Sequence, residues 1–245
     1  MLGIGTGINY ASESAVSTDL KQATSGSAEG LRLWLKNGTG VTASKWTDSS
    51  GFDNHATQST EGNQATVSGG GLDFEKDNSE HYDLTSKITI AENQGFCLAF
   101  VVTRETTTAM AILSDGGNEI LQFNNANTVR IKTNDPGNII TDAVFETGAF
   151  NSGTKFLVLI NRSAGAANRF TFFKNGTQLT ADTDNSTNEA AGENPNGFEL
   201  SVFGSRDGSA NFFDGIIHEV AFWNRSLTTQ EITDVNSYLQ SIHEL

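Results

Sequence analysis

The acidic residues of segment 75–80 have a spacing that could support chemistry on a glycosidic bond. Glu75, Asp77 and Glu80 form the pattern E-x-D-x-x-E. Glycoside hydrolysis requires two carboxyl groups that flank the scissile bond. Here Lys, Asn and Ser lie between the carboxylates, and such polar residues are typical of a turn between two strands. The spacing permits hydrolysis, but its context favours a turn, and we expect no catalytic residues.

Histidine and cysteine, the other common catalytic and metal-binding residues, form no comparable pattern. The single cysteine, Cys97, lies inside the apolar segment 95–102, so we expect it to be a small core residue. None of the four histidines has the paired spacing of a transition-metal site. They are His55, His81, His218 and His243.

Charge and composition exclude several classes of partner. The formal net charge is −14, which would repel phosphate backbones, so we expect no nucleic-acid partner. No apolar run approaches the length of a membrane span, and the Gly-rich N-terminus does not resemble a signal peptide. The sequence therefore predicts a chain without a leader or a membrane span.

The elements that would position functional residues are mainly strands. Segments 96–102 and 155–160 are nearly continuous apolar runs, as in strands buried on both faces, and segment 30–35 alternates. Many strands at short spacing indicate a β-sandwich. Further strands are expected at 120–123, 128–131, 198–203 and 216–222.

Two local signals predict a hairpin and a helix. Asn175-Gly176 has the residue types of a type I′ turn, which predicts a hairpin over 169–179. Thr228 and Glu231 have capping-box spacing, which predicts the start of a C-terminal helix. The helix would bury a stripe made of Ile232, Val235, Leu239 and Ile242.

The chain divides into an arm and one domain. Residues 1–29 are poor in large apolar side chains, so they predict an extended N-terminal arm that its own domain or a partner subunit must hold. Residues 30–245 carry the predicted strands and the helix. Segment 180–196 is a long polar loop, equally compatible with a functional role and with a solvated connection.

Several motifs of the domain resemble one family. Segment 46–56 resembles the W-x-D-x-S-G-x-x-N-x-A segment of laminin-G-like domains, and 71–74 with 81–84 resembles a strand pair of the same domains. Segment 213–228 resembles their closing strand and turn. The resemblance covers about 30–245. It implies an all-β, concanavalin A-like jelly-roll sandwich of two antiparallel sheets with one C-terminal helix.

The resemblance also implies a metal site. Calcium sites are common in this family, and the matching positions offer oxygen donors at Asp48, Asn54 and Glu219. Alternatively, Asp48 and Asn54 cap the turn between them through hydrogen bonds to the backbone. Laminarinase-type glucanases of the same sandwich class carry E-x-D-x-x-E on a strand with apolar intervening residues, which segment 75–80 lacks.

A glycan site would need exposed aromatic rings beside polar groups. Tyr82, Phe212 and Phe213 are the residues predicted to provide them. The three tryptophans match core positions of the family, so we expect them to pack inside the domain. They are Trp34, Trp46 and Trp223.

Two functional interpretations follow. The first is a non-catalytic structural or adhesion protein on the surface of a bacteriophage virion, as a capsid decoration or tail-associated subunit. It would assemble with other subunits through residues 1–29 as an oligomer and would also bind a glycan. The second is a stand-alone carbohydrate-binding module, extracellular or on a cell surface. A glycoside hydrolase comes third, because the context of its carboxylate motif is poor.

Overall fold

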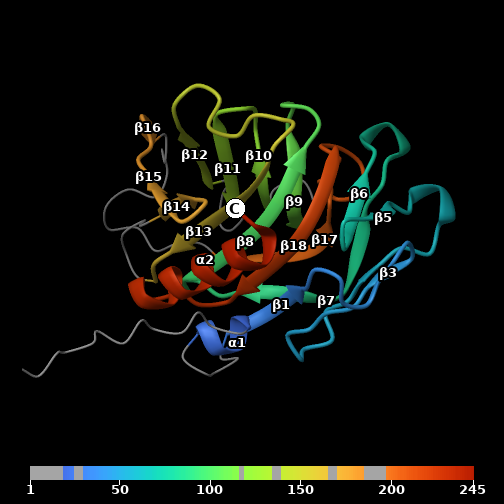
Figure 1. Ribbon diagram of the computed structural model, residues 1–245, viewed down its shortest axis with the longest axis horizontal. Coiled ribbons are helices and arrows are strands. Elements are labelled where there is room, and N and C mark those ends of the chain that lie inside the picture. The colour runs from blue at the N-terminus through green and yellow to red at the C-terminus, as the bar shows by residue number, and fades with distance from the viewer. Residues whose placement is uncertain (1–18, 25–29, 116–118, 134–138, 165–169, 185–196) are drawn as a thin grey trace, which may run out of the picture.

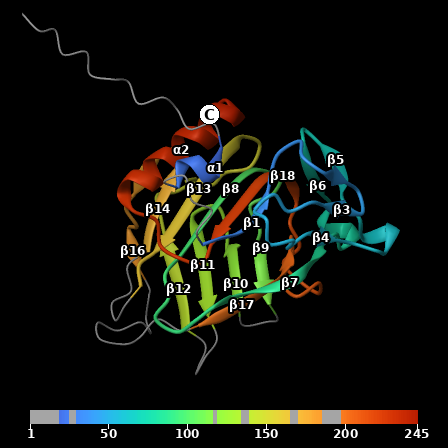
Figure 2. The same ribbon diagram turned by 90° about the horizontal axis from the view of Figure 1, so that it is seen from below.

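The chain folds into three layers. A computed structural model describes residues 19–24, 30–115, 119–133, 139–164, 170–184 and 197–245. Their strands form two antiparallel sheets packed face to face, and two helices cover the outer face of one sheet (Figure 1 and Figure 2). This confirms the predicted all-β sandwich of two antiparallel sheets with a C-terminal helix.

Sheet A lies between the helices and the other sheet. Within the described residues it has eight strands in the order β15-β14-β13-β8-β18-β6-β5, and β1 pairs with β18. Its strands are β1 (Leu31–Leu35), β5 (Thr66–Ser68), β6 (Gly71–Phe74), β8 (Phe96–Arg104), β13 (Lys155–Arg162), β14 (Phe170–Lys174), β15 (Thr177–Leu179) and β18 (Gly215–Trp223).

Sheet B carries the helix-free face of the sandwich. Its ten described strands have the order β16-β12-β11-β10-β9-β17-β7-β4-β3-β2. They are β2 (Val41–Thr42), β3 (Lys45–Trp46), β4 (Ala56–Thr57), β7 (Tyr82–Ile90), β9 (Met110–Asp115), β10 (Glu119–Phe123), β11 (Thr128–Thr133), β12 (Ile139–Val144), β16 (Thr183–Asp184) and β17 (Phe198–Phe203). Two short 3-10 helices, η1 (Glu61–Asn63) and η2 (Lys76–Asn78), lie in the connections.

The buried apolar side chains form two cores, a first core between the two sheets and a second core between sheet A and the helices, and strand β8 contributes to both. Its even-numbered side chains pack between the two sheets, and its odd-numbered side chains pack under the helices. A strand buried on both faces needs an unbroken apolar run, which is what segment 96–102 provides. The first set is Phe96, Leu98, Phe100 and Val102, and the second is Cys97, Ala99 and Val101. Cys97 is thus confirmed as a buried core residue.

Helix α2 (Thr229–His243) begins and packs as predicted except at its last turn. Thr228 and Glu231 form the capping box, and three members of the predicted stripe are buried. Ile242 is 51% exposed, whereas His243 is buried. Position 243, four residues after Leu239, continues the buried face, and position 242 turns away from sheet A. None of the described helices is long and apolar enough to cross a membrane.

The hairpin of β14 and β15 turns at Asn175 and Gly176, with φ angles of 46° and 75°. Both residues therefore have the left-handed conformation of a type I′ turn, as predicted.

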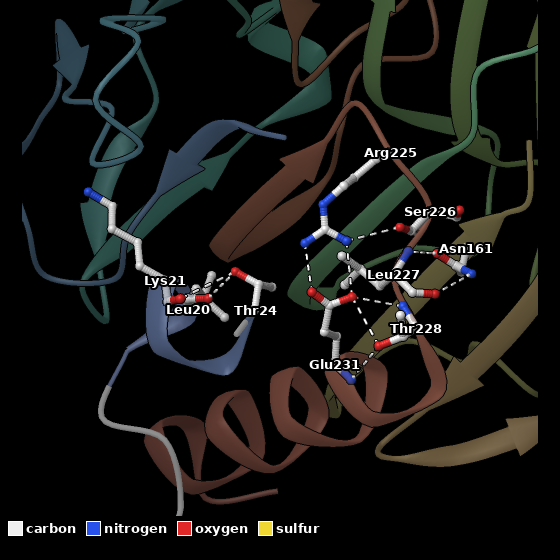
Figure 3. Close-up of polar contacts among 9 residues, drawn as sticks. All are labelled: Leu20, Lys21, Thr24, Asn161, Arg225, Ser226, Leu227, Thr228 and Glu231. Carbon is white, nitrogen blue, oxygen red and sulfur yellow. Dashed lines mark hydrogen bonds and ion pairs between the residues drawn. The ribbon is translucent and has the colours of Figure 1, made fainter. Parts of the chain in front are cut away.

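Part of the predicted arm packs on the domain. Helix α1 (Leu20–Ala23) has a side-chain cap from Asp19, and Leu20 and Ala23 are buried in the second core. Figure 3 shows α1 beside α2, which it contacts. The described part of the arm is therefore helical rather than extended. Residues 1–18 and 25–29 lie outside the described residues, so the boundary at 29 stays a prediction.

Candidate functional site

A buried carboxylate shapes the turn that follows β3. Asp48 Oδ1 accepts hydrogen bonds from the backbone amides of Trp34, at 2.8 Å, and Ser50, at 2.9 Å. Asp48 Oδ2 accepts from Ser50 Oγ, at 2.6 Å, and from the Asn54 amide, at 3.0 Å. These four donors match the approximate acceptor capacity of a carboxylate. Asp48 therefore fixes the turn that presents Phe52.

Phe52 stands on the surface of this turn as an aromatic platform. Its side chain is 48% exposed, and it is the one aromatic residue among the exposed large apolar residues that the structure describes. The Arg32 guanidinium lies 4.2 Å from the ring centroid. Asn54 ties the turn to β1, because its Nδ2 donates to the Arg32 carbonyl at 2.6 Å. The ring is thus held in place by a cation–π contact and by a braced turn.

Phe52 and Arg32 line a groove of about 480 Å³, which we call the Phe52 groove. Its lining also includes Asn54 and residues 86–89 of β7. The groove combines one apolar ring with hydroxyl, amide and cationic groups. Such an arrangement suits a ligand with a flat apolar face and hydroxyl groups at its rim.

Lys87, a cationic residue that lines the Phe52 groove, already forms ion pairs with two carboxylates. Lys87 Nζ lies 2.8 Å from Asp115 Oδ2 and 2.8 Å from Glu199 Oε2. Hydrogen bonds to Asp115 and then Glu199 raise the pKa of Lys87. The ammonium group therefore stays charged but contributes little net positive potential to the groove.

The three residues predicted to bind calcium are all engaged by protein donors. The oxygens of Asp48 accept the four bonds described above, and Asn54 bonds to β1. Glu219, 1% exposed, accepts from Trp34 Nε1 at 2.7 Å, and its other oxygen lies 2.8 Å from His243 Nε2. This pattern supports the turn-capping alternative for Asp48. Calcium at these residues stays a prediction.

A different acidic cluster has the donor type that calcium prefers. Glu75, Glu105 and Asp214 place carboxylate oxygens within 4.8 Å of one another. The register of β18 explains this meeting, because Gly215 pairs with Phe74 on one side and with Arg104 on the other. Burial and then the Glu105 charge raise the pKa of Glu75. Sequence reasoning missed the cluster, since its members are distant along the chain.

The cluster already has one protein cation. Lys76 Nζ lies 3.0 Å from Asp214 Oδ2, so one carboxylate of the three is ion-paired.

Segment 75–80 forms a turn that is braced by hydrogen bonds among its own residues. Glu80 Oε2 accepts from the Glu75 amide at 2.7 Å, and its Oε1 accepts from Asn78 Nδ2 at 3.1 Å. Residues Lys76–Asn78 form η2 between β6 and β7. This is the polar turn that the composition of the segment favoured.

Two of the predicted glycan-binding aromatics belong to the core. Tyr82 is fully buried, and its hydroxyl donates to the Ala43 carbonyl at 2.6 Å. Phe213 is also fully buried and packs on Phe74, with ring centroids 6.1 Å apart. Their prediction is therefore wrong, because neither ring presents a face to a sugar. Phe212 is half-buried beside His81, and its role stays a prediction.

Residues 76–233 match the Laminin_G_3 family, described as the concanavalin A-like lectin/glucanases superfamily. No curated protein matches the sequence.

Similar solved structures come from proteins of different function. A sialidase from Trypanosoma rangeli has a TM-score of 0.56 at 18% identity over 87% of this chain. The binding domain of Paraclostridial Mosquitocidal Protein 1 has a TM-score of 0.57 at 15% identity and covers 89% of this chain and 52% of its own. Domain 4 of AbnA, a GH43 extracellular arabinanase from Geobacillus stearothermophilus, in complex with arabinotriose, has a TM-score of 0.51 at 13% identity and covers 84% and 98%.

These similarities correct the expectation of a non-catalytic protein. Several of the similar structures are sialidases, which are glycoside hydrolases, so the exclusion of enzymes from the sequence alone does not stand. This chain spans 33% of the sialidase chain. At identities of 15–18%, the likeness to the sialidases shows a shared fold and carries no activity over to this protein.

Proposed function

Because the chain belongs to the Laminin_G_3 family of concanavalin A-like lectin/glucanase domains, we propose that it binds a glycan and that the Phe52 groove holds one of its sugars. The observation that carries this proposal is the exposed Phe52 ring, braced beside the Arg32 guanidinium. A sugar ring stacks through its C–H face on such a platform, and its hydroxyls can accept from Arg32 and bond with Ser86 and Asn54.

The charges favour a neutral glycan over an acidic one. Lys87 is balanced by Asp115 and Glu199, and the whole chain carries a formal charge of −14. An anionic polysaccharide would approach against this field. The likeness to an arabinanase domain in complex with arabinotriose supports arabinotriose as the first probe.

The test is a binding titration of the chain with arabinotriose and with neutral xylo-, cello- and laminari-oligosaccharides. We expect one of these series to bind and Phe52→Ala to weaken that binding by about tenfold, or about 1.4 kcal/mol. Val67→Ala is the matched control, because Val67 is also exposed, at 46%, but does not line the groove. Equal affinity of Phe52→Ala and the parent, or no binding in any series, would contradict the proposal.

A virion-surface location and attachment to other subunits through residues 1–29 remain proposals of the sequence. The described part of that segment, α1, contacts α2 of its own chain. This contact holds the described part of the segment on its own domain. Molar mass from light scattering tests the expected oligomer, since a monomer at all concentrations would contradict it.

A further inference from the structure

A second groove lies on the surface of sheet B. It has a volume of about 340 Å³ and is lined by the ends of β3, β4 and β7. We call it the Asp83 groove. Among the described residues, no hydrogen bond or ion pair engages the side chains of Asp83 and Lys45, so both are available to a ligand. The lining residues are Ser44, Lys45, Thr57, Gln58, Ser59 and Asp83.

The Asp83 groove opens on the outer face of sheet B, and the Phe52 groove lies between the other end of β7 and Arg32 of β1, a strand of sheet A. Ala56 and Leu84 pair across β4 and β7 and point into the core, so their neighbours Thr57 and Asp83 point outward. At the other end of β7, Thr89 lies between two core residues and pairs with Glu199 of β17. Figure 2 shows that α1 and α2 lie on the opposite side of the sandwich. No described helix therefore covers this face.

The register of β7 brings the two grooves close together. Leu200 and Val202 of β17, two residues apart, pair with Ile88 and Asp83, which are five residues apart. The segment between them must therefore arch out of the ladder, and its two ends lie about 7 Å apart along β17.

Thr85 ties this arch to the turn that carries Phe52. Its Oγ1 lies 3.0 Å from the carbonyl oxygen of Asp53 and 2.9 Å from that of His55. The arch is thus braced against the turn, and it lies between Ile88, which lines the Phe52 groove, and Asp83, which lines the other groove.

We propose that the two grooves are subsites for one extended oligosaccharide, which crosses the arch of β7. This inference rests on the proposed function and extends it to the form of the ligand: an internal stretch of a glycan chain rather than a single terminal sugar. One sugar stacks on Phe52. A sugar farther along the chain donates hydroxyl hydrogen bonds to the Asp83 carboxylate and accepts them from the Lys45 ammonium group.

The test compares chain lengths within the neutral series that binds, from the disaccharide to the hexasaccharide. The affinity of the parent is expected to rise with length until both grooves are filled and then to level off. The double variant Lys45→Ala/Asp83→Asn should lose about fivefold or more in affinity for the hexasaccharide and keep the parent affinity for the disaccharide. Phe52→Ala should weaken the binding of every length.

The outcomes separate this inference from the function on which it rests. If the parent binds disaccharide and hexasaccharide equally well, or if the double variant binds the hexasaccharide like the parent, the two-subsite inference is overturned while glycan binding stands. If no oligosaccharide binds, both fail. Asp83 is exposed and Lys45 is half-buried, and both lie outside the two cores. An unfolding temperature equal to that of the parent shows that the double variant is folded.

Discussion

Glu219 is a buried carboxylate whose partners lie on two other elements. It joins the Trp34 indole of β1 to His243 at the end of α2. Replacing it with alanine leaves both partners without an acceptor in a buried environment. We therefore expect Glu219→Ala to lower the free energy of unfolding by about 3 kcal/mol, measured by urea denaturation. Glu244→Ala, at an exposed position in the same region, is the control. A loss no larger than that of the control would show that the network contributes little.

His218, next to Glu219 on β18, gives the protein an acid sensitivity. Burial, and then the charges of His243 and Lys155, lower the pKa of His218 from 6.5 to about 4. The unfolded chain therefore takes up a proton at a higher pH than the folded chain. This contribution to stability is full above pH 6.5 and is lost as the pH falls toward 4. Its upper bound is about 3 kcal/mol.

Unfolding curves between pH 7 and 4 test this expectation. His218→Gln keeps a side chain that can bond to Thr103 Oγ1, which lies 3.0 Å from the native Nε2. The variant should lose less stability than the parent over this range. A slope equal to that of the parent would place the acid sensitivity elsewhere.

The sequence alone predicts single residues of the site only in part. Glu219 was predicted as a calcium ligand, which stays a prediction. Its observed partners, Trp34 and His243, come from strand pairing and from the last turn of α2, which no local pattern reveals. Phe52 is not among the predicted site residues, because residues 46–56 match a family motif in which position 52 is unspecified. The available signal was a phenylalanine inside a polar turn, where an apolar core residue is not expected.

At the scale of elements, the start of α2 is held by several bonds to its own capping residues and to β13. Arg225 donates to both oxygens of Glu231, at 2.7 and 3.0 Å. Burial would raise the pKa of Glu231, but the hydrogen bond from Arg225 is the larger effect and lowers it. Asn161 Oδ1 accepts from the Leu227 amide at 2.8 Å. Figure 3 shows these contacts at the first turn of α2.

The capping residue itself has a measurable contribution. Thr228 Oγ1 accepts from the Glu231 amide at 3.3 Å. Thr228→Ala removes this bond and should lower stability by about 1 kcal/mol. Thr229→Ala, one residue into the helix at an exposed position, is the matched control in urea denaturation. Equal stability of the two variants would contradict a capping role.

Short sequence patterns predict where single helices and turns form better than they predict which strands pair with one another. The Asn175-Gly176 turn and the capping box depend on nearby residues, and both are present in the structure. The meeting of Glu75, Glu105 and Asp214 depends on the order and register of β6, β18 and β8. Register across strands distant in sequence is set by packing of the whole sandwich, so the sequence pattern could not predict this cluster.

At the scale of the whole molecule, the described part of the N-terminal segment, α1, is packed into the domain that follows it. Leu20 is fully buried against the residues that also seat α2, in the second core. If this segment served only to attach the domain to a partner, its side chains would not be buried in the core of its own domain. Because α1 contacts the core, deleting it should lower the stability of the domain.

Two deletions separate anchoring from folding. Removal of residues 1–18 keeps Asp19, α1 and every described contact of the second core, so the unfolding temperature should not change. Removal of residues 1–29 also takes away α1 and exposes the apolar surface beneath it, so the unfolding temperature should fall. Leu20→Ala in the full chain should reproduce part of this loss, about 3 kcal/mol for a buried leucine. If both deletions and Leu20→Ala leave stability unchanged, α1 has no share in holding the sandwich together, and residues 1–29 act as an arm alone.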